Sequence, residues 1–382
     1  MKIVVISGTR ADYGILKPVA KYFLSKKSDL SFLISGMHLA HDYGYTVNEI
    51  KNDGFDIIGE VDSLFLENTK SNMARTVSNE INGFTNIIKK ENPDFVFLLG
   101  DRGEMLAASI SCLYLGVKTV HFHGGEVSGT VDESIRHAIS KLSSIHFTST
   151  INSKRRLERM GEDSWRVFNI GAPRLDEILN ISFPDFSLVK QKYKLNIIEK
   201  KYALLVFHPV VTEYDDTREQ IKTIIKALNL KKQKVLCILP NSDAGSSSIK
   251  DVYKDINSNL FEFVVNLHPD DYLSILKNCS YMIGNSSSGI IEAASLSVPV
   301  INIGSRQSGR EKSKNIIDSS NLLEDIIDSI DKVTSDSFLQ GLCADDNIYG
   351  DGKSSEKAFK ILRKIYETSK NDIKWIQKKI TY

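Results

Sequence analysis

Two polar segments in the first half of the chain combine acids, histidines and arginine. The shorter one, Leu99-Gly100-Asp101-Arg102, follows the apolar run FVFLL, so Asp101 either lies at a ligand-binding edge or caps the next helix. The longer one runs from His121 to His137 and holds the sequence HFHGGEVSGTVDESIRH. Carboxylates and imidazoles at this density can transfer protons near neutral pH. The candidates for catalysis here are Asp101, His123, Glu126 and Asp132.

A metal site is the alternative use of such a cluster. The segment has no spacing of the HExxH kind, however, and the four cysteines are far apart with no CxxC pair. We therefore expect no metal ion and no redox cofactor.

Two polar turns in the second half follow apolar runs. His208 follows Tyr202–Phe207 and is fixed by Pro209, so it is either a general acid or base, a phosphate ligand, or a structural histidine. Asn241 lies in the turn LPNSDAGS, where it either contacts a ligand or forms a β-turn that caps a helix.

A phosphate-binding turn is indicated at GNSSSGIIE, residues 284–292. Ser287, Ser288 and Gly289 lie at an expected helix start, where backbone N–H groups and hydroxyls can bind an anion. Glu292 lies one turn later and can accept hydrogen bonds from a ribose diol. The alternative is a polar N-cap without a ligand.

Arginines near these turns add positive charge for a diphosphate. Arg306 and Arg310 lie in the turn GSRQSGR, and Arg10 follows the first strand in GTRADYG. The first turn is not GxGxxG, so the sequence does not support a dinucleotide cofactor. Taken alone, Arg10 also fits a solvated residue at a capped helix.

The elements that must hold these turns are short apolar strands separated by amphipathic stretches of helical length. Runs such as FVFLL and ALLVF are apolar throughout, which is typical of strands buried on both faces of a parallel sheet. The expected strands are Ile3–Ser7, Leu30–Ser35, Phe55–Glu60, Asp94–Leu99, Lys118–His123, Ile145–Ser149, Val167–Ile170, Tyr202–Phe207, Lys234–Leu239, Phe261–Asn266, Tyr281–Ile283 and Pro299–Ile303. This repetition predicts an α/β fold with doubly wound parallel sheets.

One break divides the repetition into two Rossmann-like domains. We expect a first domain over residues 1–178, a lysine-rich linker over 179–201 and a second domain over 202–353. Residues 354–382 are expected to form a C-terminal helix that returns to the first domain. Two such domains that face each other would place the turns along one cleft.

Composition excludes several classes of protein. The 382 residues carry 49 basic and 48 acidic side chains, a net charge of +1, so no global field attracts nucleic acid or an anionic membrane. No apolar run approaches the length of a membrane span, and MKIVVISGTR is typical of a first strand rather than of a signal peptide. Most of the four cysteines lie in or near apolar runs, which indicates buried thiols. We expect a cytoplasmic protein.

Taken in order, these turns resemble the hydrolysing UDP-N-acetylglucosamine 2-epimerases. The matching stretches, from residue 8 to residue 352, are GTRADYG, SGMH, GDR, GGEVSGTVDESIRHAISKL, HPV, PNSDAGS, GNSSSGIIE, GSRQSGR and YGDG. The resemblance implies a glycosyltransferase-B-like fold, a UDP-sugar as the small-molecule partner, no cofactor, and a homodimer or homotetramer. It also implies release of UDP and N-acetylmannosamine for sialic acid synthesis, by elimination to a glycal and then hydration.

The resemblance assigns roles to individual residues. Asp101, Asp132 and His208 match catalytic residues of the family, and Arg10 matches an arginine that helps with the diphosphate. The UDP-binding matches are Ser287, Ser288, Gly289 and Glu292, with Arg306 or Arg310 as the arginine of the following turn.

One departure affects the choice of base. Many relatives have glutamate where this chain has His123, in a segment of the type HIEGGE. Either His123 takes that role, or Glu126 or Asp132 supplies the carboxylate.

Three alternative activities remain open from the sequence. One is the same reaction on the UDP or GDP derivative of N,N'-diacetylbacillosamine for legionaminic acid, because contacts to sugar positions 4 and 6 cannot be identified from the motifs. A glycosyltransferase of the same fold and a non-hydrolysing epimerase are the others.

Overall fold

The computed structural model describes residues 1–65, 69–127, 131–180, 182–240, 245–369 and 371–379. The chain forms two compact units. The first comprises residues 1–177 and 349–382, and the second comprises residues 178–348.

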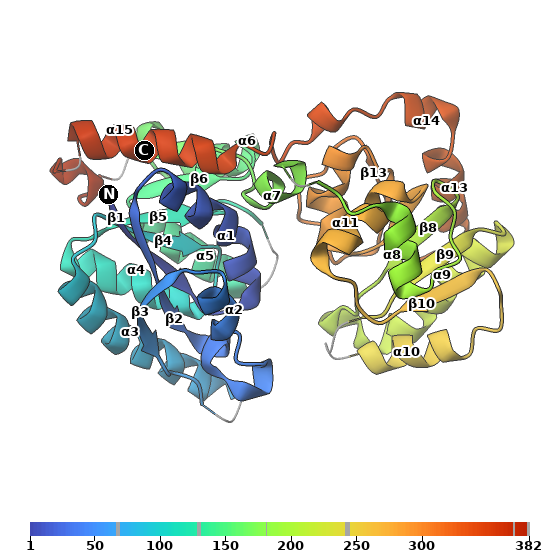
Figure 1. Ribbon diagram of the computed structural model, residues 1–382, viewed down its shortest axis with the longest axis horizontal. Coiled ribbons are helices and arrows are strands. Elements are labelled where there is room, and N and C mark those ends of the chain that lie inside the picture. The colour runs from blue at the N-terminus through green and yellow to red at the C-terminus, as the bar shows by residue number, and fades with distance from the viewer. Residues whose placement is uncertain (66–68, 128–130, 181, 241–244, 370, 380–382) are drawn as a thin grey trace. The chain divides into compact units, whose positions relative to one another are not determined.

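The first unit is built on a seven-stranded sheet with the order β3-β2-β1-β4-β5-β6-β7, in which neighbouring strands pair in parallel. Its strands are β1 Lys2–Ser7, β2 Asp29–Ser35, β3 Asp56–Val61, β4 Phe95–Leu99, β5 Lys118–Phe122, β6 Ile145–Thr148 and β7 Val167–Asn169. Its helices are α1 Arg10–Ser25, α2 Val47–Asn52, α3 Lys70–Glu91, α4 Gly103–Leu115, α5 Val131–Leu142, α6 Ile151–Arg159, α7 Arg174–Asn180, which continues three residues into the second unit, and α15 Ser354–Ser369 (Figure 1).

The second unit repeats this layout with a six-stranded parallel sheet of order β10-β9-β8-β11-β12-β13. Its strands are β8 Tyr202–Val206, β9 Lys234–Ile238, β10 Phe261–Val264, β11 Tyr281–Gly284, β12 Val300–Ile303 and β13 Ile316–Ser319. Its other helices are α8 Phe186–Tyr193, α9 Thr217–Leu230, α10 Ser246–Lys254, α11 Pro269–Asn278, α12 Ser287–Ile291, α13 Leu323–Val333 and α14 Asp336–Gln340.

The predicted α/β class with parallel sheets is confirmed in both units. The strands predicted from apolar runs are present to within a residue or two, because residues buried on both faces leave a continuous apolar signal. The apolar runs do not predict strand β13, which has only two apolar residues, Ile316 and Ile317, both partly buried, followed by Asp318 and Ser319. Cys112, Cys237 and Cys279 are buried free thiols, as expected, and Cys343 is exposed.

The segment expected to be a linker is partly helical and packs on the second unit. Helix α8 begins after Asp185, whose carboxylate accepts from Ser187 N at 2.8 Å and Leu188 N at 3.1 Å. Val189, Leu195 and Ile197 are buried in the same cluster as strand residues of the second sheet.

The predicted return of the C-terminal helix to the first unit is confirmed. Helix α15 packs beside α1 (Figure 1), and Phe359 meets the ring of Phe23 at a centroid distance of 5.2 Å. Its start is capped from a distance, because the Asp176 carboxylate accepts from the backbone N–H groups of Ser354 at 2.8 Å and Ser355 at 2.5 Å.

The residues after α15 are held by a buried ion cluster. The Glu162 side chain is 1% exposed and lies 2.7 Å from Lys378 Nζ, 3.0 Å from Lys141 Nζ and 3.1 Å from His146 Nε2. Burial alone would raise the pKa of Glu162, but His146 and Lys378 lower it to about 2.

Among the helices that the structure describes, none combines the length and the apolar character that a membrane span requires.

We expect Glu162→Gln to lower the free energy of unfolding by about 3 kcal/mol at pH 7, because it leaves Lys378 partly buried without its carboxylate. The folded-state pKa lies below the ordinary 4.5, so this contribution is present above pH 4.5 and is lost as pH falls toward 2. Urea unfolding at pH 7 and at pH 4 measures both effects. An equal loss at the two pH values would contradict the ionic contribution.

Candidate active site

The turn after β1 is organised by a buried carboxylate. Asp12 accepts from the backbone N–H groups of Gly8 at 3.0 Å and Thr9 at 3.1 Å and from Ser7 Oγ at 2.6 Å, and Thr9 caps α1 in return. Burial, and then the Glu104 carboxylate, raises the pKa of Asp12 to about 6. Helix α1 therefore begins at Arg10.

Arg10 lies on the surface of this turn. Its side chain is 68% exposed, and its Nε atom lies 3.1 Å from a Glu49 oxygen. The geometry thus places Arg10 in a surface ion pair, and its predicted role with a diphosphate stays a prediction.

An ion pair joins the turns after β4 and β5. The Nη2 atom of Arg136, on α5, donates to the Asp101 carboxylate, and the Arg136 side chain is only 8% exposed. Arg102 is the N-cap of α4, so Asp101 does not cap that helix. Asp132 lies one helical turn before Arg136 on α5.

The protonation of Asp101 is set by opposing neighbours. Burial raises the pKa of this carboxyl, Arg136 lowers it, and the carboxylates of Asp132 and Glu126 raise it again, so that the net direction is upward. These couplings place Asp101, Asp132, Glu126 and Arg136 in one electrostatic cluster. Shifted carboxyl groups of this kind are common at catalytic sites.

His123 and Glu126 form a second pair within this loop. His123 Nδ1 lies 3.2 Å from Glu126 Oε1, and Ser149 Oγ donates to the same oxygen at 2.5 Å. A carboxylate beside one ring nitrogen fixes the orientation of an imidazole. The preceding His121 is fully buried and bonds Gly100 O at 2.7 Å through Nε2, which fixes the turn that carries Asp101.

Asn285 connects the turns of the second unit. Its Oδ1 accepts from His208 N at 2.8 Å, and its Nδ2 donates to His208 O at 2.8 Å, so the ends of β8 and β11 are clamped together. Its own carbonyl accepts from Arg306 Nη1 and from Gln307 Nε2, both at 3.0 Å. Asn285 thereby positions His208 and Arg306 relative to the helix start that follows β11.

The predicted phosphate-binding turn is a polar helix start. Ser286 caps α12, and its Oγ lies 3.1 Å from Ser288 Oγ, which also bonds the Tyr272 hydroxyl. Gly289 is buried, and a Cβ there would lie 3.0 Å from Val300 Cγ1, so its small size lets the helix pack on the sheet. Glu292 is buried at the end of α12.

The structure thus places the predicted residues in two groups, one per unit. The first contains Asp101, Asp132, His123 and Glu126. The second has His208 and Arg306 around Asn285, with Ser287, Ser288, Gly289 and Glu292 on the adjoining α12 segment and Arg310 in the turn that contains Arg306. Asn241 lies outside the described residues.

Sequence reasoning did not assign two organising residues. Arg136 lies in the dense segment from His121 to His137, and its position four residues after Asp132 is a usable signal. Asn285 directly follows a buried strand, as the predicted acids do, but its partners are distant in sequence.

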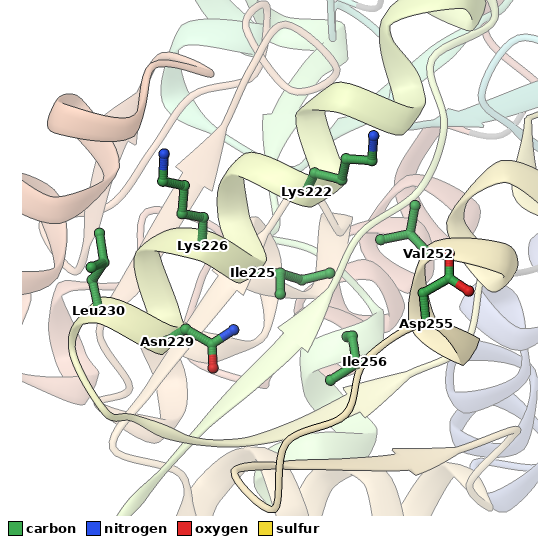
Figure 2. Close-up of a pocket in the computed structure, with 8 residues that line it drawn as sticks. All are labelled: Lys222, Ile225, Lys226, Asn229, Leu230, Val252, Asp255 and Ile256. Carbon is green, nitrogen blue, oxygen red and sulfur yellow. The ribbon is translucent and has the colours of Figure 1, made fainter.

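Two cavities differ in their relation to these groups. One, of about 500 Å³, lies in the first unit and includes Asp132 in its wall. The other, of about 440 Å³, lies between α9 and α10 of the second unit, where Ile225 and Ile256 line it beside Lys222 (Figure 2). No group of three or more histidine, cysteine or acidic side chains suited to a metal ion occurs among the described residues.

The fold and these turns define a class of protein with two Rossmann-like α/β units whose strand ends carry acids in one unit and a serine-rich turn in the other. The UDP-N-acetylglucosamine 2-epimerase family matches residues 24–363, and the chain belongs to this family.

Two relatives agree with this placement, and a solved structure shares the fold. The chain is 44% identical, over 95% of its length and 96% of the relative's, to the hydrolysing UDP-N,N'-diacetylbacillosamine 2-epimerase of Legionella pneumophila. It is 35% identical, over 94% of its length and 93% of the relative's, to the UDP-N-acetylglucosamine 2-epimerase of Neisseria meningitidis. A crystal structure of a Neisseria meningitidis UDP-GlcNAc 2-epimerase bound to UDP-GlcNAc has the same fold, with a TM-score of 0.78, 16% identity and coverage of 95% and 100%.

We expect Arg136→Gln to lower the free energy of unfolding by about 3 kcal/mol, because the partly buried Asp101 carboxylate loses its cation. For the same reason the pKa of Asp101 should rise further. Urea unfolding and carbon-detected NMR titration of the carboxyl groups measure the two effects.

Arg10→Gln is the matched control, since it removes an arginine from an exposed ion pair and should change stability by less than about 0.5 kcal/mol. If the two variants lost the same free energy of unfolding, the Arg136–Asp101 pair would stabilise the fold no more than an exposed ion pair does.

Proposed function

We propose that this chain is a hydrolysing 2-epimerase, which splits UDP from a UDP-linked 2-acetamido hexose and inverts carbon 2 of the sugar. The observation that carries the proposal is the 44% identity, over nearly the whole chain, to a relative described as hydrolysing. A second relative so described, the GDP/UDP-N,N'-diacetylbacillosamine 2-epimerase of Campylobacter jejuni, is 34% identical over 89% of this chain and 89% of its own length.

The proposed reaction has two steps. In the first, a base removes the proton on carbon 2, the bond from carbon 1 to the diphosphate oxygen breaks, and a double bond forms between carbons 1 and 2. In the second, water adds its oxygen to carbon 1 while carbon 2 receives a proton on the opposite face. The products are UDP and the free 2-epimer, with no change of oxidation state.

We assign the proton transfers to Asp101 and Asp132 of the first unit, and we propose that His208 of the second unit also transfers a proton. The Asp132 carboxylate is close enough to raise the pKa of Asp101, and the positive charge of Arg136 lowers that pKa. A positioned acid or base contributes roughly 10²–10⁴-fold to turnover. Arg136 is a positioning residue in this assignment, since it acts through Asp101.

His123 is proposed as a further proton-transfer group in place of the glutamate that many relatives have. The Glu126 carboxylate lies 3.2 Å from Nδ1 and fixes the orientation of the ring. The Ser149 hydroxyl donates a hydrogen bond to Glu126 and so fixes the position of that carboxylate.

We assign the leaving diphosphate to the second unit. The serines at the start of α12 and the guanidinium of Arg306 are donors that suit a group whose negative charge grows as the bond breaks. Two hydrogen bonds from the Asn285 side chain hold the backbone of His208 in place after β8. Glu292 is proposed to accept from the ribose hydroxyls.

Two sugars are candidates as substrate. UDP-N-acetylglucosamine would give N-acetylmannosamine for sialic acid synthesis, and a relative of 35% identity is named for this substrate. UDP-N,N'-diacetylbacillosamine would give a diacetamido sugar for legionaminic acid, and the relative of 44% identity is named for that one. Both share the chemistry at carbons 1 and 2.

With either substrate and no acceptor, we expect free UDP and a free 2-epimerised sugar in equal amounts. Anion-exchange chromatography of the nucleotide and proton NMR of the sugar identify both products. An intact epimerised UDP-sugar as the only final product would sink the hydrolysing assignment, and a requirement for an acceptor would favour a glycosyltransferase.

We expect Asp101→Asn, Asp132→Asn and His208→Gln each to lower turnover by at least about 100-fold, the usual contribution of a proton-transfer group. Their affinity for UDP should change far less. Glu292→Ala should do the reverse and weaken UDP binding by about tenfold, as expected for a lost hydrogen bond to a charged group. Calorimetry with UDP, beside steady-state kinetics, separates the two patterns, and wild-type UDP affinity in Glu292→Ala would refute the ribose assignment.

A further inference from the structure

The last turn of α5 presents a backbone carbonyl to the C-terminal segment of the chain. In a continuing helix the N–H of Ser144 would donate to the Ser140 carbonyl, but it donates to Thr119 O at 3.2 Å instead. Lys378, which follows α15, donates from Nζ to the Ser140 carbonyl at 2.8 Å. A cation is favourable at a helix C-terminus, where the last carbonyls lack helical partners. The C-terminal segment therefore caps α5, the helix that carries Arg136.

The C-terminal segment is itself held in place by contacts on both sides of this cap. Lys378 Nζ also lies 2.7 Å from Glu162 Oε2, and that carboxylate is buried. Four residues earlier, the carbonyl of Lys374 accepts from Arg166 Nη2 at 2.9 Å. Trp375 is buried in the main apolar cluster of the first unit. The Lys378 ammonium group thus has a fixed position from which to hold α5.

The hydroxyl of Ser140 extends this contact to the turn after β4. His121 Nε2 lies 2.7 Å from the Gly100 carbonyl, which can only accept, so Nε2 carries the ring proton. Burial lowers the pKa of His121 to about 3, so the ring is neutral and Nδ1 is an acceptor. Ser140 Oγ lies 3.2 Å from Nδ1 and therefore donates to it. The serine hydroxyl thus fixes the tautomer that holds Gly100, the residue before Asp101.

The same hydrogen bond lies against the turn after β5. A Cβ atom on Gly124 would lie 2.9 Å from His121 Nδ1 and 3.3 Å from Ser140 Oγ, so only glycine leaves room for the pair. Gly124 directly follows His123 and lies two residues before Glu126. The His121–Ser140 pair is therefore in contact with both turns that carry the acids and His123.

We propose that Ser140 and Lys378 are positioning residues for the proton-transfer groups of the first unit, an inference that rests on the proposed function. Lys378 holds the Ser140 carbonyl, and the Ser140 hydroxyl holds His121. His121 in turn holds the carbonyl that precedes Asp101. Because Arg136 on the same helix pairs with Asp101, the capped helix fixes this acid from two directions. Ser140 and Lys378 act through these neighbours and not on the substrate.

Such a role separates turnover from nucleotide binding. A catalytic group displaced by about 1 Å can lose roughly 100-fold in rate, because proton transfer depends steeply on distance and angle. The diphosphate is assigned to the second unit, whereas Ser140 and Lys378 belong to the first. Loss of either contact should therefore lower kcat and leave the affinity for UDP unchanged.

The first test is Ser140→Ala, which removes the hydroxyl and keeps the carbonyl that Lys378 contacts. The measurement is kcat for UDP release at pH 7, with whichever of UDP-N-acetylglucosamine and UDP-N,N'-diacetylbacillosamine the wild type turns over faster. We expect kcat to fall at least about tenfold, with the Kd for UDP unchanged by calorimetry. Ser111→Ala is the matched control, because this buried serine of α4 bonds Ala107 O at 3.0 Å and Ile81 O at 3.2 Å. It should leave kcat unchanged.

The second test is Lys378→Met, which should also lower kcat at least about tenfold, whereas Lys378→Arg keeps a cation with N–H donors and should restore most of it. Lys379→Met removes an exposed cation one residue later and is the control for charge. Because both residues act through His121, the double variant Ser140→Ala/Lys378→Met should lose less than the product of the two single losses.

Nitrogen NMR of the histidine rings checks the tautomer without turnover. We expect the neutral Nε2–H form for His121 in the wild type at pH 7. An Nδ1–H form, or wild-type kcat in Ser140→Ala, or equal losses of kcat in Ser140→Ala and Ser111→Ala, would overturn the positioning role and leave the 2-epimerase function intact. Absence of UDP release from both substrates in the wild type would instead overturn the proposed function, and the positioning role with it.

Discussion

Parallel pairing is the constraint on which the rest of this structure depends. Every strand pair in the two sheets runs in parallel, so each sheet collects all its strand-to-helix turns at one edge. Most buried strand residues are apolar, and the polar candidates for chemistry therefore lie mainly in those turns. Asp101, His123, His208 and the segment after β11 all follow a strand directly for this reason.

Gathering carboxylates at one edge creates an electrostatic cost that arginines offset. Asp101 is paired with Arg136, and Glu104 with Arg102, so that neither carboxylate is buried alone. Burial and the Glu104 carboxylate raise the pKa of Glu80 to about 7, although Ser63, Ser35 and Arg102 act in the opposite direction. In the second unit the organising residue is neutral. The Asn285 side chain and carbonyl form hydrogen bonds that connect the ends of β8 and β11 with the turn that contains Arg306.

The sequence predicts those parts of the structure whose signals are local. Apolar runs identify most strands, and the turns after them contain the acids and serines of both groups. Contacts between distant residues are not readable in this way: Arg136 meets Asp101 across 35 positions, and Asn285 meets His208 across 77. Glu80 is similar, because nothing in the polar surroundings of α3 indicates that this one acid turns inward.

Elimination followed by hydration requires that carbon 2 of the product take its hydrogen from a new source on the opposite face. Turnover of either UDP-sugar in D₂O, with mass and NMR analysis of the released sugar, measures this directly. The mechanism predicts one deuterium at carbon 2 of a 2-epimerised free sugar, with UDP as the other product. A released sugar that carries only protium at carbon 2 would contradict it, since direct hydrolysis of the bond at carbon 1 leaves carbon 2 untouched.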